Sequence, residues 1–234
     1  TFIDRLGGAL LFPFFTLYVT KKFNAGMTQV GIIFAIFSLS SVVGSFIGGS
    51  LSDRLGRKGV LLTGLITSAL ASLLMGVVSR IEIFYLITVM VGLLSNSAGP
   101  AQQAMVADLL PREKQAEGFG ILRVAINLSA SIGPMIGGLL AAHSYMLLFA
   151  SDALTSLLTA AIVYFTLTES RPKTKKRQQS NSKRKRFGGY IIVLRDQALV
   201  WFLIASMLVV VVFIQRNTTL AVFLRDIHNI TEQG

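Results

Sequence analysis

Long hydrophobic runs separated by short polar segments organise the chain. Residues 30–51 and 60–78 contain no charged side chain, and each run is long enough for a helix to cross the roughly 30 Å hydrocarbon core of a bilayer. Comparable runs, with at most two charged residues each, cover residues 2–19, 83–107, 118–142, 145–167 and 199–224. The pattern predicts an all-α transmembrane protein with six closely spaced helices, a polar linker and a seventh helix.

Composition supports a membrane protein and excludes several other classes. Hydrophobic residues make up 53% of the chain, charged residues only 14%, and the mean hydropathy is +0.66, which is too apolar for an ordinary soluble domain. The chain has no cysteine, and its two histidines are His143 and His228. We therefore expect no disulfide, no metal site and no cofactor. An enzyme would need clustered metal ligands or a nucleophile with a base, and the sequence contains no such group.

The segment from Gly49 to Lys58 reads GSLSDRLGRK and separates two uncharged runs. We expect a tight loop in which Gly49 and Gly56 let the backbone bend and Asp53 caps the following helix. Three basic side chains should hold this loop on the cytoplasmic side, namely Arg54, Arg57 and Lys58.

The pattern G-x-L-S-D-R-x-G-R-K resembles the loop 2–3 motif of the major facilitator superfamily. The resemblance implies a twelve-helix fold of two six-helix halves, of which this chain would hold the N-terminal bundle and a seventh helix. It also implies that Asp53 and Arg57 belong to a charge network that latches the halves in the outward-facing state. From the residues alone, a generic positive-inside loop remains open.

The fifth hydrophobic run carries small residues and one proline at Gly120, Ser129, Gly133, Pro134, Gly137 and Gly138. This pattern resembles the fifth-span motif of facilitator antiporters, with Ser129 where glycine is usual, and the resemblance implies export rather than uptake. Small residues four positions apart allow close helix packing, and a proline bends the helix. We expect this face to pack against the other half.

Two other runs carry packing predictions. Small residues recur every four positions in the second run, at Ser40, Gly44, Gly48 and Ser52. Packing within one bundle and a sliding contact between halves both remain open for this stripe. Residues 60–78 carry only small polar side chains, so we expect the third helix to be peripheral.

Polar residues inside the first and fourth runs are candidates for a cavity. Asp4 and Arg5 either snorkel at the cytoplasmic mouth or place a titratable carboxylate in the central cavity. Asn96 and Gln102 lie at mid-membrane depth, where unpaired polar groups are costly, so they should line a cavity or form interhelical hydrogen bonds. Gln103 is a weaker candidate for the same role.

The later runs add further polar candidates. Arg123 precedes Asn127 by one helical turn, and its guanidinium should either pair with Asp4 or snorkel to the cytoplasm. Gln215 and Asn217 interrupt the last run, and intramembrane polar groups usually face the bundle interior. We therefore expect the substrate cavity to be lined by Asn96, Gln102, Arg123, Asn127, Gln215 and Asn217.

Carboxylates are the candidates for coupling transport to protons. Asp4 and Asp53 are the best placed, with Asp108 third. Asp108 should also form a salt bridge with Arg57, although a solvated carboxylate is the alternative. Asp152, in the sixth run, is expected to cap, snorkel or bond a neighbour rather than transfer protons.

Charge distribution predicts the topology. Basic residues gather in segments 54–58, 112–114 and 171–195, and the other loops carry only Lys21, Lys22, Arg80 and Arg225. This bias places the N-terminus and the linker in the cytoplasm of a plasma-membrane protein, and it predicts anionic lipid rather than nucleic acid as the linker's partner. We divide the chain into a six-helix bundle at 1–168, a basic linker with a short amphipathic segment at 169–198, and the first helix of a truncated C-terminal bundle at 199–234.

The resulting hypothesis is a secondary active transporter that works by alternating access. It would export small amphipathic or drug-like molecules in exchange for protons, with the missing C-terminal half completing the site. Uptake of a sugar, peptide or other metabolite is the alternative, and a membrane-embedded enzyme or receptor is a less favoured class.

Overall fold

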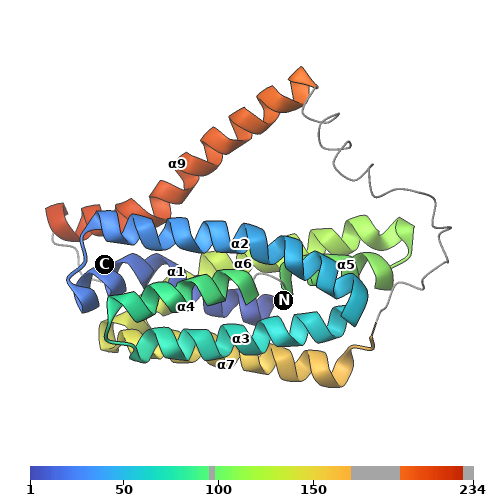
Figure 1. Ribbon diagram of the computed structural model, residues 1–234, viewed down its shortest axis with the longest axis horizontal. Coiled ribbons are helices and arrows are strands. Elements are labelled where there is room, and N and C mark those ends of the chain that lie inside the picture. The colour runs from blue at the N-terminus through green and yellow to red at the C-terminus, as the bar shows by residue number, and fades with distance from the viewer. Residues whose placement is uncertain (95–97, 170–195, 229–234) are drawn as a thin grey trace.

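The computed structural model describes residues 1–94, 98–169 and 196–228, and only the backbone of residues 50 and 53–55 and of nearly all residues beyond 212. The helices are α1 (Phe2–Phe23), α2 (Met27–Leu55), α3 (Arg57–Val77), α4 (Ile81–Leu94), α5 (Ala98–Leu109), α6 (Arg112–His143), α7 (Tyr145–Thr166) and α9 (Gln197–His228). Helices α1 to α7 run along one common axis, and α9 lies at an angle to this axis and projects away from the bundle toward its own N-terminal end (Figure 1).

Six helical segments among the described residues are long and apolar enough to cross a membrane, with α4 and α5 counted as one segment. This result confirms the expected six-helix transmembrane bundle. Helix α9 adds a seventh helix, whose part from Gln197 to Val212 is apolar. The linker and its expected amphipathic segment at 187–196 lie almost entirely outside the described residues.

The two ends of the bundle differ in chemistry. At one end, which we call the basic end, α2 leads into α3 and α5 leads into α6, and this end carries Arg57, Lys58, Arg112 and Lys114. At the opposite end, short connections join α1 to α2, α3 to α4, and α6 to α7 (Figure 1).

The core is densest near the opposite end. Tyr18, Phe84 and Phe149 pack there into one buried cluster, and the Tyr18 hydroxyl donates a hydrogen bond of 2.6 Å to the Met75 carbonyl. By contrast, large apolar side chains such as Phe165, with 82% of its surface exposed, face outward. An apolar outer surface is what a helical bundle presents to lipid.

The small-residue face of α6 packs against α1. Ser129 is buried and donates to the Phe2 carbonyl at 3.1 Å. A methyl group added at Gly137 would lie 2.5 Å from the Leu10 carbonyl oxygen, and one at Gly133 would lie 2.5 Å from the Ala9 side chain. The expectation that this face packs against the other half is therefore wrong, because α1 of the same bundle occupies it.

The stripe on α2 also packs within the bundle. A methyl group added at Gly44 would lie 2.5 Å from the Gly92 carbonyl oxygen, and one at Gly92 would lie 2.5 Å from the Ser40 side chain. Of the two alternatives left open by the sequence, the described residues show packing between α2 and α4.

The predicted peripheral position of α3 holds for one face of this helix, where Ile66, Leu70 and Val77 are exposed. Its buried residues include Leu61, Leu65 and Ser72, and α3 packs closely along α7 (Figure 1). The small polar side chains of α3 did not reveal the buried face, although such side chains are compatible with burial when helices lie close together.

The expected ten-residue loop at 49–58 is almost entirely helical. Helix α2 continues to Leu55, α3 begins at Arg57, and Gly56 alone separates them with φ 108°. Side-chain-bearing residues rarely adopt this φ, so a glycine is required there. The N-cap of α3 is Gly56 rather than Asp53, whose side chain lies outside the described residues.

A polar cavity inside the helix bundle

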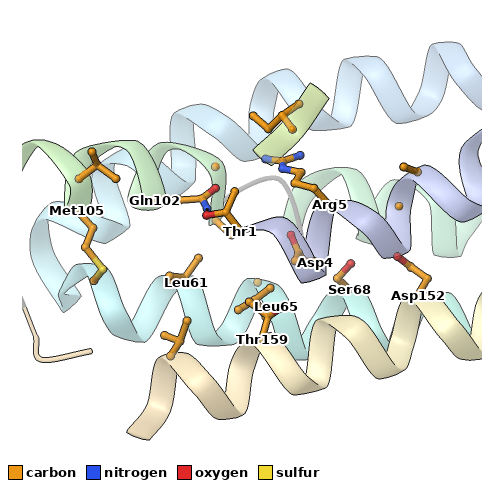
Figure 2. Close-up of a pocket in the computed structure, with 18 of the residues that line it drawn as sticks. Thr1, Asp4, Arg5, Leu61, Leu65, Ser68, Gln102, Met105, Asp152 and Thr159 are labelled. Atoms are coloured by element: carbon orange, nitrogen blue, oxygen red, sulfur yellow. The ribbon is translucent and has the colours of Figure 1, made fainter. Parts of the chain in front are cut away.

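A cavity of about 630 Å³ lies inside the bundle, between α1, α3, α5 and α7 (Figure 2). Its lining is largely apolar. The polar side chains that contribute to it are Thr1, Asp4, Arg5, Ser68, Gln102, Asp152 and Thr159. Two carboxyl groups and one guanidinium are therefore the charged groups of this lining.

Asp4 lies in the cavity at the middle of the bundle. Its Oδ1 accepts a hydrogen bond of 3.2 Å from Ser156 Oγ, halfway along α7, and its surface is half-buried. Arg5, the next residue on α1, is exposed and lines the same cavity. Of the two alternatives left open for Asp4, the structure therefore shows the cavity position rather than the cytoplasmic mouth.

Asp152 is a second carboxyl group on this cavity, a position that the sequence analysis did not predict. It is only 9% exposed, it lines the cavity from α7, and it interacts with Asp4 and with Ser72 of α3. A methyl group at Gly7 would lie 2.9 Å from its Oδ1, so the bare α1 backbone makes room for this carboxylate. Capping and snorkelling, two of the roles expected for Asp152, are wrong.

A sequence signal for this site exists in α7. Asp152, Ser156 and Thr159 recur at spacings of four and three residues, which places them on one helix face. Thr159 Oγ1 is buried and has no hydrogen-bond partner among the described residues. An unpaired hydroxyl on the cavity wall is available to a ligand or to water.

The other predicted cavity residues are spread over different environments. Gln102 lines the cavity and its Nε2 donates to Thr1 Oγ1 at 2.5 Å, whereas Gln103 is exposed. Arg123 and Asn127 are exposed on α6 and do not line this cavity. Among the described side chains, no ion pair joins Arg123 to Asp4. Asn96 and the side chains of Gln215 and Asn217 lie outside the described residues.

A second cavity of about 140 Å³ adjoins the first. Phe12, Phe37, Ser68, Val91 and Asp152 line both cavities. The remaining lining of the smaller one is mainly apolar and comprises Leu11, Phe15, Ile33, Phe34, Ser72, Met75 and Thr88. Asp152 is thus the charged residue at the junction of a polar and an apolar space.

The basic end contains the ion pair expected from the sequence. Arg57 Nε lies 2.5 Å from Asp108 Oδ2, and only 10% of the Arg57 side chain is exposed. This pair joins the start of α3 to the end of α5. The Asp53 and Arg54 side chains, which the motif would add to it, lie outside the described residues.

Glu169 is a second residue that the sequence analysis missed, because it was assigned to the linker. Its Oε1 accepts hydrogen bonds from the backbone N–H of Arg57 at 2.7 Å and of Lys58 at 3.3 Å. Lys58 Nζ in turn donates to the Tyr164 carbonyl at 2.7 Å. The carboxylate therefore caps α3 and ties its start to the end of α7.

Metal binding by a multi-ligand cluster is not supported by the described part of the chain. No group of three or more His, Cys, Asp or Glu side chains comes together there. The cavity chemistry is instead that of two carboxyls with neighbouring hydroxyls, which can hold protons, organic cations or monovalent ions.

Comparisons with known proteins agree with this architecture. Residues 1–234 match the family model described as Major Facilitator Superfamily. The Na(+), Li(+), K(+)/H(+) antiporter of Planococcus maritimus is 26% identical over 230 residues, which cover 93% of this chain and 54% of that protein. The quinolone resistance protein NorA of Staphylococcus aureus is 30% identical over 148 residues, covering 63% of this chain and 38% of NorA.

The fold also matches a solved structure. A bacterial homologue of the human lysosomal transporter Spinster, in an inward-facing and unoccupied conformation, superposes with a TM-score of 0.81 at 15% identity. The match covers 99% of this chain and 55% of that one. The chain thus spans about half, or less, of the length of the proteins it matches.

Proposed function

Because this chain belongs to the Major Facilitator Superfamily, we propose that it forms the N-terminal half of a proton-coupled transporter that exports small amphipathic or drug-like molecules. The observation that carries this proposal is the pair of carboxyls, Asp4 and Asp152, on one cavity inside the bundle. The names of two relatives, a cation/proton antiporter and a quinolone resistance protein, support antiport and export. The second half of the protein would complete the site.

We assign proton coupling to Asp4. Coupling requires a carboxyl that exchanges its proton with water on each side of the membrane in turn. Asp4 is half-buried on the cavity, where the charges of Arg5 and Asp152 also act. Asp108 is a weaker candidate because Arg57 already engages it, and Asp53 remains a candidate from its motif alone.

A second candidate function is exchange of monovalent metal ions for protons. It is favoured by the Planococcus relative, which covers most of this chain, and by the hydroxyls of Ser156 and Thr159 beside the two carboxyls. Oxygen ligands of this kind suit Na⁺ or Li⁺. The metabolite uptake considered from the sequence has no specific support in the cavity.

The decisive test is transport by the full-length protein in inside-out vesicles with an imposed pH gradient. A cationic dye should accumulate only while the gradient lasts, and a protonophore should abolish its uptake. Asp4→Asn should remove this coupling, whereas Glu82→Gln, at an exposed carboxylate outside the cavity, should leave it intact. Dye accumulation by Asp4→Asn at the normal rate would refute the assignment. Proton release driven by Na⁺ or Li⁺ but not by the dye would favour metal-ion exchange.

We further propose that the basic end and the linker face the cytoplasm of the plasma membrane, as the basic residues indicate. This chain has no cysteine, so a full-length background from which any other cysteine has been removed allows a direct test. An impermeant maleimide added to intact cells should label Ser79→Cys at the opposite end and spare Glu113→Cys at the basic end. The reverse labelling pattern would refute this orientation.

A further inference from the structure

The smaller cavity has a lining that proton transfer alone does not require. Phenylalanines surround it from two helices, Phe12 and Phe15 from α1 and Phe34 and Phe37 from α2. Phe34 meets the rings of Phe12 and Phe15 edge-on, with centroids 6.1 and 5.7 Å apart. Aromatic walls in such contacts are adapted to hold another flat apolar group.

The size of this cavity defines what it accepts. Its volume of about 140 Å³ is close to that of an engineered apolar cavity of roughly 150 Å³ that binds benzene. One aromatic ring without large substituents therefore fits, and a larger molecule would extend into the adjoining cavity. The cavity lies between the helices, with Ile33 and Met75 completing its apolar wall.

A negatively charged group lies where the smaller cavity meets the larger one. Asp152 is the charged residue that lines the smaller cavity, and Ser68 and Ser72 add hydroxyls beside it. A ring in the smaller cavity would lie beside this carboxyl, so that a short cationic substituent on the ring would face it. A cation there would also benefit from the neighbouring phenylalanine rings, since aromatic faces attract positive charge.

We propose that the two adjoining cavities form one site for a small aromatic ammonium ion, with its ring among the phenylalanines and its ammonium group at Asp152. The proposal rests on the proposed function, since it names a substrate class for that transporter. The described residues that line both cavities all come from the six-helix bundle. Arg5 lines only the larger cavity, so its positive charge lies outside the space that receives the ring.

Three probes test the proposal on the unmodified full-length protein in lipid nanodiscs. Benzylammonium carries both ring and charge, benzyl alcohol carries the ring without charge, and methylammonium carries the charge without the ring. Isothermal titration calorimetry should show benzylammonium binding at least tenfold more tightly than either of the others. Equal binding of benzyl alcohol would overturn the role of Asp152, and equal binding of methylammonium would overturn that of the phenylalanine cavity.

Two variants locate the site. Val91→Phe adds a ring at the junction and should reduce benzylammonium affinity at least tenfold. The same change at Val42, which is 56% exposed on α2, should leave the affinity unchanged. Asp152→Asn should bring benzylammonium affinity down to that of benzyl alcohol. Unchanged affinity in Val91→Phe would overturn the proposal even if Asp152→Asn failed to fold.

The outcomes separate this inference from the proposed function. Proton-coupled dye transport without preferential benzylammonium binding would overturn the aromatic site and leave the transporter proposal standing. Preferential binding of benzylammonium, together with dye transport that does not depend on the pH gradient, would support the aromatic site and overturn proton coupling.

Discussion

The carboxylate of Glu169 offers the sharpest test of how this bundle is held together. It accepts hydrogen bonds from two backbone N–H groups at the start of α3, and these groups have no partner within their own helix. Glu169→Ala removes both bonds and the negative charge. Glu169→Gln removes the charge but keeps an acceptor oxygen. Comparison of the two variants therefore separates the contribution of the hydrogen bonds to stability from that of the negative charge.

The expected effect follows from known capping energies. Loss of a capping acceptor costs about 1 kcal/mol, and a negative charge at a helix N-terminus contributes about 0.3–1 kcal/mol. Because Glu169 is exposed to solvent, we use the lower part of the range for the energy contributed by its charge. Glu169→Ala should therefore destabilise the protein by about 1–1.5 kcal/mol, and Glu169→Gln by less than half of that amount.

Two measurements check this prediction. The midpoint of heat denaturation of purified protein, read by size-exclusion chromatography, should fall by about 2–4 °C for each kcal/mol lost. Hydrogen exchange in a peptide spanning residues 56–60 should accelerate in Glu169→Ala. Glu117→Ala, at an exposed carboxylate of α6, should change neither quantity. If Glu169→Ala matched this control in both, the capping role would be refuted.

Three further outcomes follow from described contacts. Arg57→Gln and Asp108→Asn should show a coupling energy of about 1–2 kcal/mol in a double-mutant cycle, since Arg57 is nearly buried; additive effects would contradict the ion pair. Gly137→Ala should lower stability by about 1–3 kcal/mol because α1 leaves no room for a methyl group, whereas Gly120→Ala, in open space, should not. Tyr18→Phe should cost about 1 kcal/mol by leaving a carbonyl of α3 unpaired, and an unchanged denaturation midpoint would show that this bond contributes nothing.

Much of the fold was predictable because membrane helices leave a simple signal. A lipid-exposed helix must be apolar over its full length, so the six spans and the seventh helix could be placed from hydropathy alone. Helix ends were less predictable. The charged residues from Asp53 to Lys58 indicated a loop, yet one glycine at positive φ is enough to turn the chain.

The partner of each packing face could not be predicted for a different reason. A stripe of small residues indicates that something approaches closely, but the stripe does not identify the neighbour. Gly133 and Gly137 were assigned to the other half of the transporter, whereas α1 covers them. Sequence spacing along one helix contains no information about which other helix lies opposite.

The site was predictable only in part. Asp4 stood out as a charged residue in an apolar run, and the structure places it on the cavity. For Asp152, the distance from the helix end predicts capping or snorkelling and gives no sign of a place on the cavity. The burial of Asp152 depends on the packing of α1 and α3 against α7, because this packing brings Gly7 and Ser72 next to its carboxyl group.

Helix α7 connects the cavity to the basic end. Asp152 and Ser156 contact the cavity side of α1 and α3, and Glu169 lies just beyond the C-terminal end of α7, where it caps α3. From Asp152 to the end of this helix at Thr166 there are 14 residue steps, or about 21 Å at 1.5 Å per residue. Because α7 extends from the cavity to the region of the Glu169 cap, a shift of α7 against α3 at the cavity would also act on this cap. The carboxyl groups of the cavity and the cap at the basic end are therefore linked through α7.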